Sequence, residues 1–257
     1  MQVYESLLVP RMFTPWAELL LDELAVETGE AVLDVACGPG SVARLAAARV
    51  GPLGYVIGCD LSPAMLEIAE AKPPLDGSGP ITYHEAPADR MPVDAGAFDA
   101  LTCQQGLQFV SDRPAALAEM LRALRPGGRL GVAVWTEIDG SPPHRALADA
   151  LQATVGPELA EGFRGGPWGF PDGERLGALV SEAGFDEVRV STHALPVTFE
   201  GGAPQLLSML AVTPAAAEID QLPDERRRQL LAALAAEVGD GPIVSKMTSN
   251  IVLARRP

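Results

Sequence analysis

The sequence predicts an α/β fold built on a doubly wound, Rossmann-like sheet. Short apolar segments alternate with segments whose apolar residues recur at helical spacing, as in repeated strand and helix units. Most of the short segments are continuous apolar runs and do not alternate between apolar and polar residues, as strands covered on both faces require. A chain of 257 residues that is 47% apolar can form one large core with an appended cap.

Seven strands are expected, mostly parallel, with the last antiparallel. Five apolar segments supply the parallel strands, because strands joined by helices pair in parallel. FDEVRV and the alternating end KMTSNIVLARR supply the other two. The five parallel strands are expected at residues 31–36, 55–60, 81–85, 98–103 and 129–135.

Helices are expected between these strands. Thr14-Pro15 and Ser62-Pro63 each place a capping side chain before a proline at the first helical position. The segment AALAEMLRALRPGG keeps an apolar stripe at helical spacing and is expected to stop at its Pro-Gly-Gly end.

The stretch VLDVACGPG, residues 32–40, predicts a ligand site at the end of the first strand. Ligands of such sheets bind beyond the carboxyl ends of the strands, near the point where strand order reverses. Gly38 and Gly40 lack a Cβ, so the backbone can approach a ligand there. Asp34 can either anchor the turn or meet a cationic group of the ligand.

Two classes of cofactor remain open on these residues. Gly38 to Ala43 fits the dinucleotide pattern G-x-G-x-x-A, and Asp60 follows Gly40 by twenty residues, so an NAD(P)-dependent oxidoreductase is the rival interpretation. The Tyr-x-x-x-Lys pair of short-chain dehydrogenases is missing, because none of the tyrosines has a lysine four residues later.

Five sequence blocks resemble the class I S-adenosylmethionine-dependent methyltransferases, and in particular the type 11 small-molecule group that includes ubiquinone/menaquinone C-methyltransferases. The blocks are VLDVACGPG, VIGCDLSPAMLEIA, APADRMPVDAGAFDALTCQQGLQFV, RALRPGGRLGVAVW and LVSEAGFDEVRV. The resemblance implies S-adenosylmethionine as cofactor and methyl transfer as the activity.

The resemblance also implies roles for residues at the strand ends. Asp34, Gly38 and Gly40 match the motif that meets the methionine part of the cofactor, with Ala36 where many members have glycine. Asp60 matches the acid that accepts hydrogen bonds from the ribose hydroxyls. The remaining matches are Leu61 and Met65 beside the adenine, Ala88 and Asp89 at its amino group, and Cys103 and Gln104 at the methionine ammonium and the mouth of the site.

The chemistry of S-adenosylmethionine agrees with these acids. A diol, an amine, an ammonium and a sulfonium are best met by carboxylates and carbonyls, whereas a pyrophosphate needs the anion site at a helix start. Asp34, Asp60 and Asp89 supply carboxylates at three predicted strand ends.

Two residues are candidates for catalysis. Most of the rate gain in methyl transfer can come from alignment, so a base is needed only if the acceptor must lose a proton. His144, which follows the fifth strand, is the first candidate for that base, and Gln104 for orienting the acceptor. The alternative for His144 is an exposed residue at a helix start.

A single methyltransferase domain is expected over residues 1–257. Within it we expect a helical lid at 1–28, a cofactor-binding core at 29–138, and substrate-selecting helical cap insertions at 139–170 and 200–245, where helix-period segments are broken by glycine and proline.

Composition narrows the partners. A formal charge of −15 argues against a nucleic acid or an anionic membrane, so we expect a small-molecule methyl acceptor, such as a secondary metabolite or a quinone-like compound. No signal peptide or membrane-length apolar run is visible, which predicts a cytoplasmic protein. The cysteines suggest core residues and no metal site. Two possibilities stay open: a homodimer, and a protein that binds the cofactor without transferring methyl.

Overall fold

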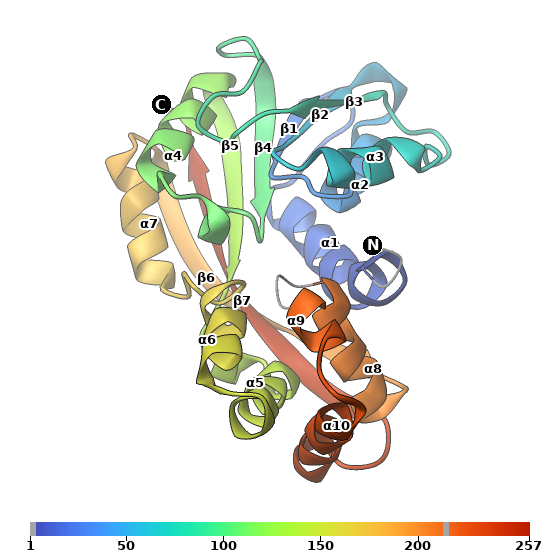
Figure 1. Cartoon of the computed structure of the whole chain (residues 1–257). Coiled ribbons are helices and arrows are strands. Elements are labelled where there is room, and N and C mark those ends of the chain that lie inside the picture. Colours follow the sequence, from blue (N-terminus) through green and yellow to red (C-terminus); the bar gives the residue numbers. More distant parts are fainter. Residues whose placement is uncertain (1–3, 213–215) are drawn as a thin grey trace. The chain divides into compact units, whose positions relative to one another are not determined.

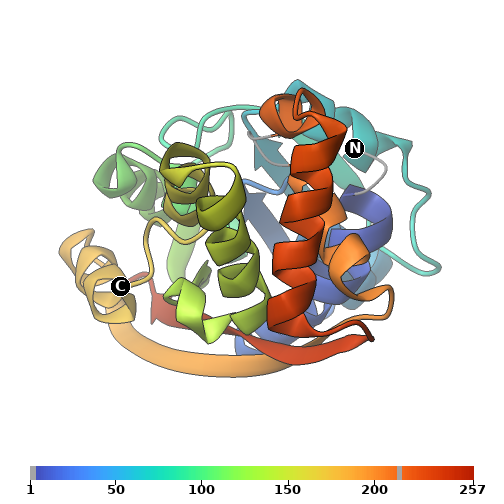
Figure 2. The same cartoon turned by 60° about the horizontal axis from the view of Figure 1, so that its bottom comes forward.

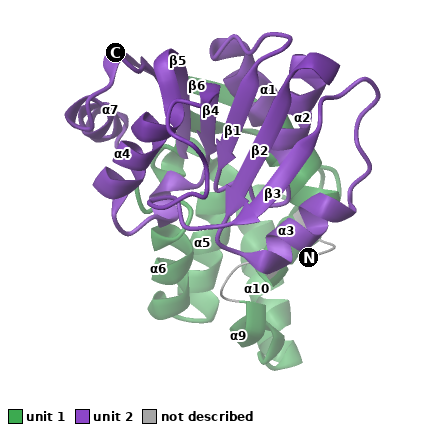
Figure 3. Ribbon diagram, turned by 90° about the horizontal axis from the view of Figure 1, so that it is seen from above, with its two compact units in different colours: residues 1–15, 135–171, 193–249 green, residues 16–134, 172–192, 250–257 purple. Residues whose placement is uncertain are grey.

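The computed structural model describes residues 4–212 and 216–257 (Figure 1). The chain forms two compact units, shown in Figure 3. Unit 1 holds the described residues of 1–15, 135–171 and 193–249, and unit 2 holds residues 16–134, 172–192 and 250–257.

The strands form a seven-stranded sheet in the order β3-β2-β1-β4-β5-β7-β6. The pairs β1–β2, β1–β4, β2–β3 and β4–β5 are parallel, and the last strand is antiparallel, so the predicted Rossmann-like fold class is confirmed. The strands are β1 (Ala31–Val35), β2 (Tyr55–Asp60), β3 (Ile81–Glu85), β4 (Phe98–Gln104), β5 (Leu124–Trp135), β6 (Asp186–Phe199) and β7 (Ile243–Arg255).

Strand order reverses between β1 and β4. The chain adds β2 and β3 on one side of β1, then returns to add β4 and β5 on the other. Connections leaving β1 and β4 therefore diverge at their carboxyl ends, which is where open α/β sheets bind ligands. The register sets Asp34 of β1 beside Thr102 of β4.

Helices α1 and α2 cover unit 2's central strands with small and branched apolar side chains. Leu20, Leu21, Ala43 and Ala46 are fully buried in this core, which also includes Val32 of β1. Helices α4 and α7 lie side by side (Figure 1). The helices of unit 2 include α1 (Thr14–Glu23), α2 (Ser41–Val50), α3 (Pro63–Ala71), α4 (Arg113–Ala123) and α7 (Gly173–Glu182), with short turns η2 (Gly51–Leu53) and η3 (Leu107–Phe109).

Helix α4 ends earlier than predicted, before the stop expected at Pro126. The helix ends at Ala123, before the Pro-Gly-Gly segment, because Leu124 already pairs with Phe98 of β4. Gly127 and Gly128 exchange main-chain hydrogen bonds with Arg256 instead of capping the helix. A pairing partner far along the chain thus overrides a local stop signal.

Unit 1 consists largely of helices from three separate chain segments. Helix α5 packs against both α6 and α10, and α10 also packs against α8, as can be followed in Figure 2. Its elements are η1 (Tyr4–Phe13), η4 (Ile138–Gly140), α5 (Pro142–Thr154), α6 (Pro157–Gly165), α8 (Gly202–Ser208), η5 (Met209–Val212), α9 (Ala216–Asp220) and α10 (Asp224–Val238), with helix η1 of π type.

The predicted lid and cap segments contain these helices, but their roles over a substrate stay predictions. Residues 1–3 of the expected lid and residues 213–215 of the expected cap lie outside the described residues. Within the described ranges, we find no helix with the length and apolarity that crossing a membrane requires.

Candidate active site

The glycine-rich turn joins β1 to α2 through three residues with positive φ. These are Ala36 at 54°, Gly38 at 53° and Gly40 at 77°. Main-chain hydrogen bonds fix the turn at Cys37, whose N–H donates to the carbonyl of Cys59 at 3.0 Å and whose carbonyl accepts from Gly40 N–H at 3.0 Å. The chain thereby leaves the sheet in a tight, defined loop.

The two glycines serve different purposes. A Cβ at Gly38 would meet no atom within 4 Å, so this position has space for a ligand, whose binding there stays a prediction. A Cβ at Gly40 would instead lie closer than 3.0 Å to the Tyr83 hydroxyl and would also crowd Ala69. Packing against Tyr83 and Ala69 therefore also favours glycine at position 40, and the contact of Gly40 with a ligand stays a prediction.

Asp34 caps helix α2 from the neighbouring strand. Gly40, at the N-cap position, has no side chain to offer the first N–H groups of the helix. The Asp34 Oδ2 atom accepts from Ala43 N–H at 3.0 Å, while Oδ1 accepts from the Thr102 hydroxyl at 2.8 Å. Of the two roles considered for Asp34, the structure supports the anchor of the turn.

Burial favours the neutral, protonated form of the Asp34 side chain. Its side chain is only 1% exposed, and this burial raises its pKa to about 7 despite the hydrogen bonds from Thr102 and Ala43. Desolvation disfavours the ionised form, and the nearby Asp60 adds a smaller repulsion. A cationic ligand at this edge of the sheet would favour ionisation of Asp34.

Asp60 ends β2 and joins it to the glycine-rich turn. Its Oδ2 accepts from Gly38 N–H at 2.8 Å, and its Oδ1 accepts from Ser62 N–H at 2.8 Å. Ser62 is the N-cap of α3 as predicted, but its own side chain makes no capping bond. Each carboxylate oxygen has two lone pairs, so the half-buried Asp60 can accept further hydroxyl donors.

The four expected adenine neighbours lie after β2 and β3. Leu61 is 69% exposed, an unusual setting for a large apolar side chain, and Met65 on α3 is half-buried. Ala88 is half-buried and Asp89 exposed in the turn that follows β3. Their contact with a cofactor stays a prediction.

Cys103 and Gln104 end β4, where they were expected. Both are buried, and burial raises the pKa of the Cys103 thiol, which favours an inert thiol. The next residue, Gln105, has a positive φ of 54° and donates its N–H to the Ala133 carbonyl at 2.8 Å.

His144 belongs to unit 1 and is fully buried at the first turn of α5. Its Nδ1 lies 2.5 Å from the Ser141 hydroxyl, and its ring packs against Trp168 and Phe199 at centroid distances of 5.2 and 6.1 Å. Burial lowers its pKa to about 3, so the imidazole is neutral. The alternative of an exposed histidine is therefore excluded, while a catalytic role stays a prediction.

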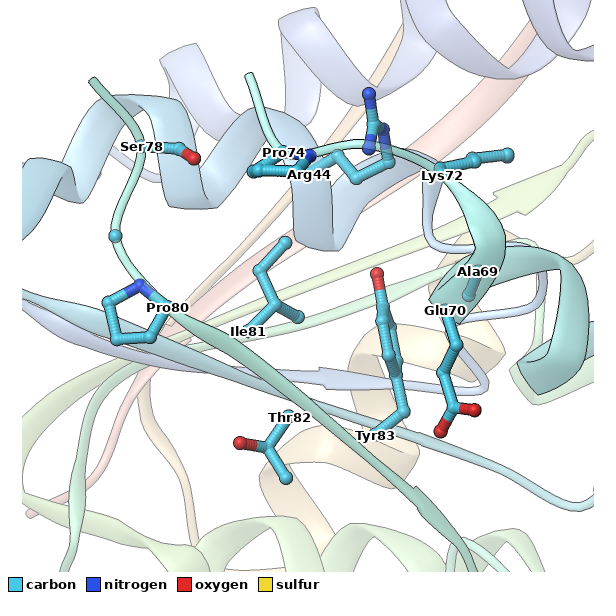
Figure 4. Close-up of a pocket in the computed structure, with 11 residues that line it drawn as sticks. Arg44, Ala69, Glu70, Lys72, Pro74, Ser78, Pro80, Ile81, Thr82 and Tyr83 are labelled. Carbon is cyan, nitrogen blue, oxygen red and sulfur yellow. The ribbon is translucent and has the colours of Figure 1, made fainter. Parts of the chain in front are cut away.

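A cavity of about 520 Å³ lies behind the glycine-rich turn, between α2, α3 and β3 (Figure 4). The Tyr83 hydroxyl, which faces Gly40, points into the side that carries Arg44 and Lys72. Lys72 Nζ donates to the Pro39 carbonyl at 2.7 Å. Two lining side chains, Lys72 and Tyr83, thus lie against the turn at Pro39 and Gly40.

Sequence reasoning missed three residues that support these sites: Thr102, Lys72 and Ser141. Thr102 is the one hydroxyl in the strand segment FDALTCQ, a signal that could have paired it with Asp34. The other two gave no local signal, because each acts on a partner chosen by packing. Among the described residues, no group of three or more His, Cys, Asp or Glu side chains could hold a metal ion.

The donor set fits S-adenosylmethionine better than a dinucleotide. A carboxylate at the end of β2 suits the ribose diol of either cofactor, and Gly38 leaves the turn open beside it. At the start of α2, however, the Ala43 N–H is already occupied by Asp34, which weakens the anion site that a pyrophosphate needs.

Comparisons with known proteins also favour S-adenosylmethionine as the cofactor. The ubiE/COQ5 methyltransferase family matches residues 3–199. The ubiquinone/menaquinone biosynthesis C-methyltransferase of Pseudomonas paraeruginosa (strain DSM 24068 / PA7) is 33% identical over 188 residues, covering 67% of this chain and 72% of that protein. The demethylmenaquinone methyltransferase of Lactococcus lactis is 32% identical over 188 residues, covering 69% and 74%.

Solved structures share the fold. The phosphoethanolamine N-methyltransferase 2 of Haemonchus contortus has a TM-score of 0.62 at 18% identity and covers 100% of this chain and 56% of its own. The (4+2)-cyclase SpnF has a TM-score of 0.57 at 22% identity, with coverage of 95% of this chain and 82% of its own.

The predicted S-adenosylmethionine-dependent methyltransferase acting on a small molecule is confirmed, and the nicotinamide enzyme is not favoured. The chain belongs to the ubiE/COQ5 methyltransferase family.

Proposed function

We propose that unit 2 binds S-adenosylmethionine at the edge formed by the glycine-rich turn and Asp60, and that the enzyme methylates a carbon of a small, quinone-type acceptor. One observation carries the cofactor site: the Asp60 carboxylate lies 2.8 Å from the N–H of Gly38, the open position of the turn. The acceptor class rests on the relatives, which are named as ubiquinone/menaquinone and demethylmenaquinone methyltransferases.

Bound S-adenosylmethionine supplies a methyl group on a positively charged sulfur. The chain's own contribution is to hold and orient. Asp60 would accept hydrogen bonds from the ribose hydroxyls, and Leu61 and Met65 would cover the adenine. The carbonyls at the end of β4 would accept hydrogen bonds from the ammonium. Holding two reactants in line can lower a barrier by about 7–11 kcal/mol, so orientation can supply most of the catalysis. A ring carbon that accepts the methyl group loses its hydrogen as a proton, which water takes up if no side chain does.

His144 and Gln104 are the proposed residues for the acceptor. The Nε2 atom of His144 is buried and has no hydrogen-bond partner among the described residues, while Nδ1 is held by Ser141. A histidine with a pKa near 3 retains a proton poorly, so the proposed role is a neutral hydrogen bond to a polar group of the acceptor. A homodimer stays a proposal without structural support in this single chain.

The activity is tested with methyl-labelled S-adenosylmethionine and a soluble demethylated naphthoquinone that carries a short side chain. A chemical reductant keeps the naphthoquinone as its hydroquinone, because the electron-rich reduced ring is the nucleophile. We expect mass spectrometry to find the label on a ring carbon of the product. Turnover that leaves the product unlabelled would instead indicate a cofactor-binding protein that does not transfer methyl. The cyclase SpnF, which has a similar fold, is the reason to include this outcome.

The cofactor site is tested by Asp60→Ala. Loss of hydrogen bonds to a charged group should weaken S-adenosylmethionine binding by about 1.5–3 kcal/mol, or roughly 10- to 150-fold, in titration calorimetry. Asp76→Ala, in an exposed loop of the same unit, is the matched control and should bind like the unmodified protein. Unchanged affinity in Asp60→Ala would leave Asp60 only its bonds to Gly38 and Ser62.

A further inference from the structure

Two non-glycine residues adopt left-handed backbone conformations at the ends of neighbouring strands. Ala36 follows β1 and Gln105 follows β4, each with a φ of 54°. Left-handed conformations are unfavourable for residues with a Cβ, and they persist only where the surroundings impose them. Such strain gathers at binding sites, where it forms part of the pre-organised geometry.

Gly106 shows the opposite mismatch. Its φ of −110° and ψ of −38° are available to any residue, so no backbone requirement explains a glycine there. Space explains it, because a Cβ at position 106 would lie closer than 3.0 Å to the Ala36 Cβ and 3.4 Å from Cys103 Sγ. The strained position therefore carries a methyl group, and the unstrained position beside it carries none.

The contact joins the turn after β1 to the turn after β4. Each side is held by the sheet, since Cys37 N–H donates to the Cys59 carbonyl at 3.0 Å and Gln105 N–H donates to the Ala133 carbonyl at 2.8 Å. Ala36 itself is half-buried, like Gly38, so it lies where the turn meets solvent. The Ala36 methyl group therefore restricts an otherwise permissive, ligand-facing turn.

We propose that Ala36 is a positioning residue whose methyl group, seated against Gly106, holds the glycine-rich turn in its cofactor-binding conformation. This inference rests on the proposed cofactor site at that turn. A glycine at position 36 would adopt the same φ without strain but would also sample many others. The methyl group thus contributes to affinity by reducing the ordering that binding requires.

The first experiment is Ala36→Gly. We expect an unfolding midpoint that is unchanged or higher, because strain is relieved, together with a 3- to 10-fold higher Kd for S-adenosylmethionine in calorimetry. Amide hydrogen exchange of residues 37–40 should become faster. If the methyl group had a purely structural role, Ala36→Gly would lower both the unfolding midpoint and the affinity, which would overturn the proposal. An unchanged Kd would also overturn it.

Ala25→Gly is the matched control. Ala25 is also left-handed, with a φ of 51°, but it is exposed in the connection before β1. Its replacement relieves the same kind of strain away from the turn, and the Kd for S-adenosylmethionine should not change. An equal rise in Kd in both variants would also overturn the proposal.

The second experiment tests the contact by exchanging the two residues. Gly106→Ala should lower the unfolding midpoint and raise the Kd, because its Cβ collides with that of Ala36. The double variant Ala36→Gly/Gly106→Ala should recover the unfolding midpoint. A double variant no more stable than Gly106→Ala alone would refute the contact.

Asp60→Ala, measured in parallel, separates this inference from the proposed function. If the unmodified protein does not bind S-adenosylmethionine, or if Asp60→Ala binds it equally well, the proposed cofactor site fails. If Asp60→Ala binds weakly while Ala36→Gly keeps full affinity, only the positioning role of Ala36 fails.

Discussion

Asp34 in unit 2 and His144 in unit 1 are both buried polar side chains, with exposures of 1% and 0%, but their surroundings differ. Both carboxylate oxygens of Asp34 accept hydrogen bonds, from Thr102 at 2.8 Å and Ala43 at 3.0 Å. The His144 ring has one hydrogen bond among the described residues, between Nδ1 and the Ser141 hydroxyl, and its Nε2 atom has no partner there.

The difference shows two ways of building a polar group into a core. The fold itself completes the bonds of Asp34, which lets the side chain connect β1, β4 and α2 before any ligand arrives. Unit 1 surrounds His144 with aromatic rings and leaves one nitrogen for a ligand or water. The first arrangement is that of a scaffold, and the second fits the proposed role of His144 in acceptor binding.

The largest expected effect tests whether the fold holds the turn that Asp34 anchors. Gly40→Ala adds a Cβ at a φ of 77° that collides with Tyr83, so overpacking and left-handed strain should together cost about 2–5 kcal/mol of unfolding free energy. Chemical denaturation measures this cost.

Gly77→Ala provides the matched control for Gly40→Ala. Gly77 has a similar φ of 71°, but a Cβ there meets no atom within 4 Å. Its replacement should cost only the left-handed strain, about 1–2 kcal/mol. Equal costs at the two glycines would show that Tyr83 yields easily and that the turn is less constrained than the contacts indicate.

The next effect separates Asp34 and His144 by pH. The pKa of Asp34 is raised from 3.8 to about 7, so the folded state holds the extra proton and its stability falls as pH rises through that window. The pKa of His144 is lowered from 6.5 to about 3, so the unfolded state holds the extra proton and stability rises with pH. Between about pH 4 and 6.5 the two contributions oppose each other.

Removing either group should reveal the other. Denaturation of Asp34→Asn between pH 4.5 and 6.5 should show stability rising more steeply with pH than in the unmodified protein, by about 1 kcal/mol per pH unit. His144→Phe, which keeps an aromatic ring in the cluster, should show the opposite change in slope. Slopes parallel to that of the unmodified protein in both variants would contradict these opposite pKa shifts.

Sequence alone located the scaffold well because its signals are local. The strands at 55–60 and 81–85 have the predicted bounds, and Ser62-Pro63 begins α3 as expected. A continuous apolar run followed by a turn residue or a capping pair depends only on neighbouring residues. Asp60 was placed at its strand end for the same reason.

The contacts that organise the site depend on register and could not be predicted. Asp34 meets Thr102 only because β1 and β4 pair in one particular register across 68 residues of chain. Gly40 is constrained by Tyr83, which lies two strands away from β1. The sequence around His144 resembles an exposed helix start, and its burial follows from aromatic residues in other segments.

The smallest effect tests a feature of the turn's surroundings that resembles His144. The Tyr83 hydroxyl is also buried without a hydrogen-bond partner in the described part of the chain. Tyr83→Phe should therefore leave the unfolding free energy unchanged or raise it by up to about 1 kcal/mol, with Tyr55→Phe, a more exposed tyrosine, as control. A loss of more than 1 kcal/mol would mean that the hydroxyl bonds a molecule in the adjoining cavity, and unit 2 would then share with His144 a polar atom that the fold does not satisfy.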